Sequence, residues 1–222
     1  MSHPDWLAPL VEAARAARPE DISMFLPPDD GSGRASAVLI AFAETDEGPG
    51  VLLIERAADM RRHPGQVAFP GGAVDPEDAD DVAAALREAR EEVGLDPVSV
   101  QILAELPAIF IPPSGFVVTP VLAWWHTPHA VAPVDAAEVA RSAVVAISAL
   151  TDPANRFRVR HPSGWLGAGF EVDGFFVWGF TAMLLDRLLT MAGWNRPWNQ
   201  DVRRPIPDQG RPLEQPGRGP VR

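Results

Sequence analysis

The sequence predicts a protein of the α/β class, and three observations support this prediction. The chain has 222 residues, which suits a single domain of generous size. Short runs of aliphatic and β-branched residues, typical of buried strands, alternate with segments whose apolar residues recur at helical spacing. The hydrophobic fraction of 46% and the charged fraction of 22% are ordinary for a soluble globular protein.

The first part of the chain is expected to form a helix and then strands. Trp6, Leu10 and Ala14 recur at helical spacing, so residues 1–35 are assigned to an N-terminal helix and the loop after it. The stretches ASAVLIAFAE (35–44) and GVLLIER (50–56) predict two strands joined by an acidic turn. QVAFP (66–70) predicts a short third strand, which ends at Pro70 and a glycine pair.

The second part is expected to contain two helices and several strands. Val82, Leu86, Ala89 and Val93 form an apolar stripe before Gly94, which predicts a helix that packs on the sheet through Val82 and Leu86. Strands are predicted near 98–106, 116–125, 142–147 and 175–178, with an irregular segment before the last, and a helix at about 179–192. Residues 195–222 are rich in proline, glycine and charge, so we expect a tail that is disordered or draped on the surface.

Composition excludes several classes of function. The net charge of −11 argues against sequence-independent nucleic-acid binding, which needs a basic surface. The chain has no cysteine, so disulfides and thiolate metal sites are absent. Its first residues lack the apolar core of a signal peptide, and GFFVWGFTAMLL is too short to span a membrane before the charges that follow. A cytoplasmic protein without membrane association is expected.

Three glutamates lie within one helical turn, at Glu88, Glu91 and Glu92. They occupy an arc of about 100° opposite the apolar stripe, and a solvated helix face is the ordinary explanation of such a cluster. Two features favour a metal site instead. Like charges at this spacing repel weakly, and Gly71 and Gly72 allow a tight backbone approach just before the helix. Three carboxylates can hold one hard cation, Mg²⁺ or Mn²⁺.

The stretch REAREEVGL resembles the signature helix of the Nudix hydrolases. The fixed positions of that pattern are occupied by Arg87, Glu88, Glu91, Glu92 and Gly94. The preceding loop departs from the pattern: it is one residue longer between Gly72 and Arg87, and Asp78 or Glu77 replaces the expected glutamate. The resemblance implies an α/β/α sandwich with a mixed central sheet over residues 36–194. It also implies metal-dependent cleavage of a phosphoanhydride, with the three glutamates as ligands and Arg87 holding a glutamate.

The segment LLIERAADMRRHPGQVAFPGG (52–72) is similar to the coenzyme A pyrophosphatase branch of the Nudix hydrolases, and so is PPSGFVVTPV (112–121). The similarity implies hydrolysis of the diphosphate of coenzyme A or acyl-coenzyme A to 3′,5′-ADP and (acyl-)4′-phosphopantetheine. Arginine matches the geometry of phosphate, which suits a substrate with a further phosphate group. The implied substrate-binding residues are Arg56, Arg61, Arg62, His63, Gly71 and Gly72.

Several alternatives stay open at this point. The general base is either Glu138 or a glutamate of the signature helix. The substrate could be another nucleoside diphosphate derivative, such as ADP-ribose, a dinucleotide or a nucleoside triphosphate. A non-catalytic Nudix-like binding module is a further alternative, which three intact glutamates disfavour. The sequence is compatible with a homodimer.

Overall fold

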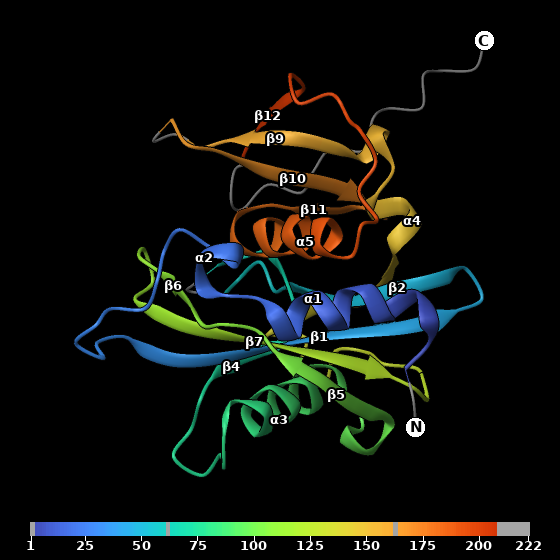
Figure 1. Ribbon diagram of the computed structural model, residues 1–222. Helices are drawn as coiled ribbons and strands as arrows, with labels where there is room; N and C mark the ends of the chain where they lie inside the picture. Colours follow the sequence, from blue (N-terminus) through green and yellow to red (C-terminus); the bar gives the residue numbers. More distant parts are fainter. Residues whose placement is uncertain (1–2, 61–62, 162–163, 208–222) are drawn as a thin grey trace.

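The computed structural model describes residues 3–60, 63–161 and 164–207. Within these ranges the strands form one sheet of eight and one sheet of four. Helix α3 (Asp81–Val93) covers one face of the larger sheet, while α1 (Ala8–Ala16) and α5 (Gly179–Met191) cover the other (Figure 1). The smaller sheet lies beyond α5. The predicted α/β/α sandwich is confirmed, and the smaller sheet is an additional layer.

The larger sheet is mixed, as expected. Its central strands follow the order β3-β2-β1-β7-β5, with β8 paired to β2, β4 to β1 and β6 to β7. The β1–β7 pair is parallel and the other pairs are antiparallel. The strands are β1 (Arg34–Thr45), β2 (Gly48–Arg56), β3 (Val67–Ala68), β4 (Gly71–Ala73), β5 (Val100–Glu105), β6 (Ile109–Ile111), β7 (Phe116–Trp125) and β8 (Val139–Ala146).

Strand β1 is apolar throughout its centre because both of its faces are covered. Ile40 and Phe42 belong to the core shared with α1 and α5, whereas Leu39 and Ala41 belong to the core under α3. Alternate residues of a strand point to opposite faces, so a doubly covered strand has no polar side. Short elements complete this part of the chain: 3₁₀ turns at Asp5–Leu7 and Pro97–Ser99, and α2 (Pro19–Ile22).

Helix α3 has clear end signals. The Asp80 carboxylate accepts a hydrogen bond from the N–H of Ala83 at 2.7 Å, and Gly94 ends the helix in a left-handed conformation. The prediction that Val82 and Leu86 pack on the sheet is confirmed, and both are partly buried against the core under this helix. The buried residues are Ala84, Ala85, Ala89, Glu92 and Val93. Small alanines on the buried face let the helix approach the sheet closely, and Glu92 lies on the same face one turn after Ala89.

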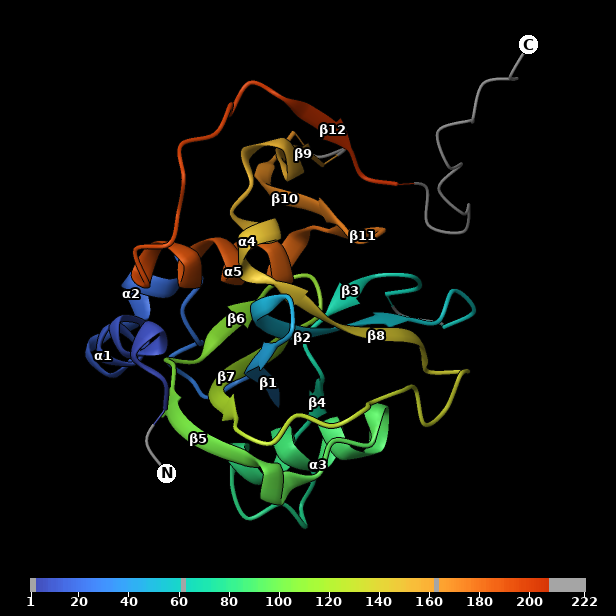
Figure 2. The same cartoon turned by 90° about the vertical axis from the view of Figure 1, so that its right-hand side faces the viewer.

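The region predicted as irregular forms most of the smaller sheet. Its order is β11-β10-β9-β12, from β9 (Arg156–Arg160), β10 (Leu166–Val172), β11 (Phe175–Val177) and β12 (Arg203–Pro205). Strand β12 pairs in parallel with β9, so the tail is ordered by this contact as far as the described residues extend. Figure 2 shows the tail passing from α5 to the outer side of β9. Residues 208–222 lie outside the described part of the chain.

A buried arginine fastens this layer to the tail. Arg156 is 2% exposed and forms an ion pair with Asp186 of α5. Its other terminal nitrogen donates to the side-chain oxygen of Asn195 at 2.6 Å, and its guanidinium lies 4.8 Å from the ring centre of Trp198.

Short helical segments at Ile147–Leu150 (α4) and Pro153–Asn155 connect β8 to this sheet. No described helix is long and apolar enough to cross a membrane.

Candidate active site

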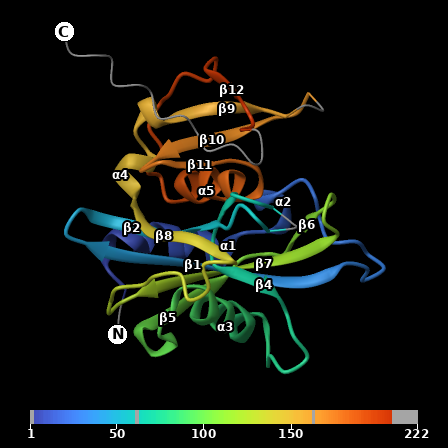
Figure 3. The ribbon, with the colours of Figure 1, turned by 180° about the vertical axis from the view of Figure 1, so that it is seen from behind.

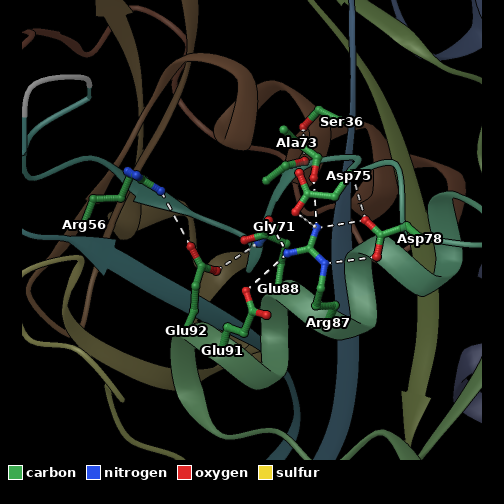
Figure 4. A network of polar contacts seen from close by, with 11 residues as sticks. Ser36, Arg56, Gly71, Ala73, Asp75, Asp78, Arg87, Glu88, Glu91 and Glu92 are labelled. Carbon is green, nitrogen blue, oxygen red and sulfur yellow. Dashed lines mark hydrogen bonds and ion pairs between the residues drawn. The ribbon is translucent and has the colours of Figure 1, made fainter.

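The candidate site is centred on Glu92, a carboxylate on the last turn of α3 that is only 6% exposed. One of its oxygens accepts the N–H of Gly71 at 3.0 Å, and the other lies 3.6 Å from a terminal nitrogen of Arg56 (Figure 4). Burial raises the pKa of Glu92 to about 8, against the lowering effects of the Gly71 N–H and Arg56. The negative charges of Glu88 and Glu138 raise this pKa further.

The glycine pair is required by close packing on two sides. A Cβ on Gly71 would lie 2.3 Å from the carbonyl oxygen of Ala37 in β1. A Cβ on Gly72 would lie 2.5 Å from the carboxylate of Glu88. The hydroxyl of Ser36, itself buried, donates to the carbonyl oxygen of Gly72 at 2.6 Å. The pair is thus held between β1 and the glutamates, where any side chain would displace one of them.

Arg87 organises the acidic side of the site. Its Nε and one terminal nitrogen donate to the two oxygens of Asp78 at 3.0 and 2.9 Å, and the same terminal nitrogen donates to the carbonyl of Ala73 at 3.0 Å. Its other terminal nitrogen donates to Glu88 at 2.9 Å and to Glu91 at 3.2 Å. Asp78, rather than Glu77, is therefore the acid that replaces the expected loop glutamate. The hydrogen bonds from Arg87 lower the pKa of Asp78.

The three glutamates have different environments. Glu88 is partly buried, and desolvation raises its pKa while Arg87 opposes the shift. Glu91 is exposed, with 59% of its side chain accessible, and Glu92 contacts Gly71 and Arg56 rather than Arg87. Among the residues that the structure describes, no three acidic or histidine side chains already form a group that could hold a metal ion. Arg87 thus binds Glu88 and Glu91, whereas Glu92 accepts the N–H of Gly71.

The predicted substrate-binding residues are only partly brought together. Arg56, at the end of β2, reaches Glu92, and its Nε is buried without a hydrogen-bond partner. His63 is exposed, and its Nδ1 lies 2.9 Å from the side-chain oxygen of Gln66 in the same turn. Arg61 and Arg62 lie outside the described residues.

Two further residues, Glu138 and Ser36, come close to the site only in the folded chain. Glu138 precedes β8, and its carbonyl accepts the N–H of Ala57, which follows Arg56. Its charge influences the pKa of Glu92, which fits its candidacy as a base. Ser36 carried no sequence signal, because a lone serine at the start of an apolar strand is unremarkable until its distant partner is known.

A mixed sheet between helices, with a glutamate-rich helix directly behind a glycine pair, defines a class of hydrolases. The model of the NUDIX domain matches residues 33–158, and the chain belongs to the Nudix family. It is 40% identical over 171 residues to the uncharacterized Nudix hydrolase NudL of Enterobacter sp. (strain 638), covering 72% of this chain and 83% of that protein. NudL of Salmonella paratyphi B is 38% identical over 167 residues, with the same coverage. These relatives support Nudix hydrolase activity.

A solved structure agrees with the fold. The crystal structure of a Nudix hydrolase from M. smegmatis, RenU, superimposes with a TM-score of 0.52 at 21% identity. The match covers 79% of this chain and 98% of RenU. At this identity the likeness concerns the fold alone.

Proposed function

We propose that this Nudix hydrolase cleaves the diphosphate of coenzyme A or acyl-coenzyme A, releasing 3′,5′-ADP and 4′-phosphopantetheine or its acyl form. The observation that carries the proposal is the contact between Arg56 and Glu92 at 3.6 Å. Arg56 belongs to the segment that resembles the coenzyme A branch, and Glu92 belongs to the signature helix. Substrate-binding and metal-binding residues then meet at one point.

The donor set fits Mg²⁺ or Mn²⁺, because Glu88, Glu91 and Glu92 offer only hard oxygen atoms. Glu92 is buried with a single N–H donor and one arginine nearby, so its charge is incompletely compensated. A cation held by the three glutamates would complete that compensation. When bound, the metal supplies neutralisation of charge on the phosphoryl oxygens and acidification of a water molecule. Glu91 has to turn from Arg87 to join the ligand set.

The remaining residues of the site have positioning and proton-transfer roles in this proposal. Before the metal binds, Arg87, itself held by Asp78, keeps Glu88 and Glu91 together despite their repulsion. The N–H of Gly71 fixes the orientation of Glu92. Glu138 is our candidate for the base that accepts the proton of the attacking water, with Glu88 as the second choice.

Phosphate recognition is assigned to Arg56 and to the next residues of the same segment, Arg61, Arg62 and His63. A charge-assisted hydrogen bond contributes roughly 1.5 to 3 kcal/mol, which is about tenfold to a hundredfold in catalytic efficiency. Coenzyme A should therefore be cleaved about tenfold to a hundredfold more efficiently than dephospho-coenzyme A. The assignment to Arg61 predicts that Arg61→Ala reduces this preference more than it slows cleavage of dephospho-coenzyme A.

The test is a substrate panel containing coenzyme A, dephospho-coenzyme A and ADP-ribose, with Mg²⁺ and Mn²⁺ in parallel and products separated by chromatography. Both coenzymes share the diphosphate, so their ratio is insensitive to general damage at the metal site. Equal efficiency on the two coenzymes, or faster cleavage of ADP-ribose, would refute the coenzyme A assignment and leave Nudix hydrolysis intact. We also propose a homodimer, which light scattering on the purified protein tests directly.

A further inference from the structure

We propose that the outer edge of the smaller sheet binds a small molecule with adjacent phosphate groups, at a site separate from the glutamate helix. The site consists of Arg158, Arg160 and Arg203, hereafter the arginine cluster. Arg203 of β12 is the direct partner of Arg158 in β9, and Arg160 is two residues further along β9. Paired residues and residues two apart share one face of a sheet. The three side chains therefore lie on the same face.

Among the residues that the structure describes, the arginine cluster has no acidic partner. Within the described part of the chain, none of the three side chains has a hydrogen bond or an ion pair. The neighbouring arginines of the same sheet differ in this respect: Arg156 pairs with Asp186, and Arg204 pairs with Glu171. The chain has 30 acidic and only 19 basic residues, so acidic partners are abundant in the sequence.

The Arg203–Arg158 pair is an element of the β12–β9 pairing that opposes its stability. Like charges directly opposite each other on neighbouring strands are destabilising, and here a segment of the tail folds back to bring Arg203 against Arg158. An anion bound on this face would attract both guanidinium groups and offset their mutual repulsion. Local features that oppose stability without compensation are a sign of function.

The spacing defines the class of ligand. Neighbouring strands lie about 4.8 Å apart and residues two apart along a strand about 6.6 Å, so the three Cα atoms form a compact triangle. Guanidinium groups bind phosphate oxygens in pairs, and three of them on this triangle can contact two adjacent phosphoryl groups. A diphosphate or polyphosphate compound fits this arrangement better than a single carboxylate.

The position of the arginine cluster separates it from the glutamate helix. In the sheet order β11-β10-β9-β12, strand β11 is the one that contacts β3 of the larger sheet, and β12 is the opposite edge. Figure 3 shows β9 and β12 on the side of the molecule remote from α3. An anion bound there would act as an effector or a retained ligand rather than as the reacting substrate. The competing explanation is that charged residues merely protect an edge strand from aggregation.

Isothermal titration with inorganic pyrophosphate, in EDTA and at low salt, tests the proposal without metal-dependent binding at the glutamates. We expect saturable binding with a Kd below about 1 mM, and about tenfold weaker binding for Arg158→Ser and for Arg203→Ser. Arg187→Ser is the matched control, because Arg187 is an exposed arginine on α5 and its loss changes the net charge equally. The control should bind within twofold of the wild type. Thermal melts verify that each variant is folded.

Three outcomes would overturn the proposal. Absence of saturable binding in the wild type would leave edge protection as the role of the arginine cluster. Equal weakening by Arg187→Ser would indicate a general charge effect. Loss of binding in Arg56→Ala, with Arg158→Ser unaffected, would assign the pyrophosphate to the glutamate site. The readout is binding without metal, so each of these outcomes is independent of the coenzyme A assignment. Hydrolysis by the Arg158→Ser and Arg203→Ser variants should stay within twofold of the wild type.

Discussion

Replacing Glu92 with glutamine separates the catalytic role of this residue from its structural role. The amide keeps the shape of the side chain, and its carbonyl can still accept the Gly71 N–H at the observed 3.0 Å. Above its raised pKa of about 8, Glu92 is ionised, and the change then removes a negative charge 3.6 Å from Arg56. At an effective dielectric constant of about 20, that attraction amounts to about 5 kcal/mol before desolvation is counted. Desolvation of a buried carboxylate costs several kcal/mol in the opposite direction.

These two contributions nearly cancel, so we expect the free energy of unfolding in EDTA to change by no more than about 2 kcal/mol. Turnover should respond differently, because a metal ligand contributes several kcal/mol to stabilising the charge of the transition state. At 1.36 kcal/mol for each tenfold change, a loss of about 3 to 5 kcal/mol lowers kcat by roughly 10² to 10⁴.

The assay is kcat at saturating Mg²⁺, together with urea unfolding of the metal-free protein. Glu47→Gln, in an exposed turn between β1 and β2, is the control and should leave both quantities unchanged. Near wild-type turnover of Glu92→Gln at saturating Mg²⁺ would show that Glu92 is not an essential ligand. A large loss of stability would show that the buried ion pair, rather than chemistry, explains the effect.

Three further predictions concern residues that support the site or the fold. Asp78→Asn should weaken the hold on Arg87 and lower kcat by about tenfold to a hundredfold with little change in substrate KM, which steady-state kinetics measures. Ser36→Ala should raise the Mg²⁺ concentration for half-maximal activity several-fold, and Ser36→Thr should restore it if the hydroxyl bond to Gly72 is the cause. Arg156→Ala should cost about 3 to 5 kcal/mol in urea unfolding, because it breaks a buried ion pair and removes packing; an unchanged midpoint would exclude that anchoring role.

The larger sheet and the two long helices could be predicted because their patterns are local. The strand predicted at 116–125 coincides with β7, and the helix predicted at 179–192 ends one residue later than α5. The third strand, predicted at 66–70, is limited to Val67–Ala68 (β3), and the glycine pair that is predicted to end it belongs to a further strand, β4. Strand β4 forms only by pairing with β1, and the local sequence does not encode the register of that pairing.

Apart from β11, which lies within the strand predicted near 175–178, the strands of the smaller sheet are not predicted, because their sequences are short or interrupted by glycine. RFRVR in β9 alternates arginine with apolar residues, and β10 contains Gly167 and Gly169, which normally weaken a strand. The structure explains these glycines by contact. A Cβ on Gly167 would overlap the ring of Trp165 at 1.9 Å, and one on Gly169 would lie 2.5 Å from Val159. The three residues of β12 depend entirely on pairing with β9 and could not be found locally.

At the site, the sequence indicated which residues matter but not how their charges are shared. The signature pattern named Arg87 and the three glutamates as one group, yet Glu92 is paired with Arg56 of strand β2. This division depends on the close approach of the glycine pair to β1, which is a tertiary contact.

The departure of the loop from the family pattern acquires a physical explanation in Asp78. An aspartate is one methylene shorter than the expected glutamate, so the backbone that carries it must come closer to Arg87. The additional residue between Gly72 and Arg87 provides the chain length for that approach, and Asp78 binds the guanidinium with both oxygens at 2.9 and 3.0 Å. The longer loop and the shorter acid therefore compensate for each other. Since both terminal nitrogens of Arg87 also contact other groups of the site, the two departures together preserve the contact on which Glu88 and Glu91 depend.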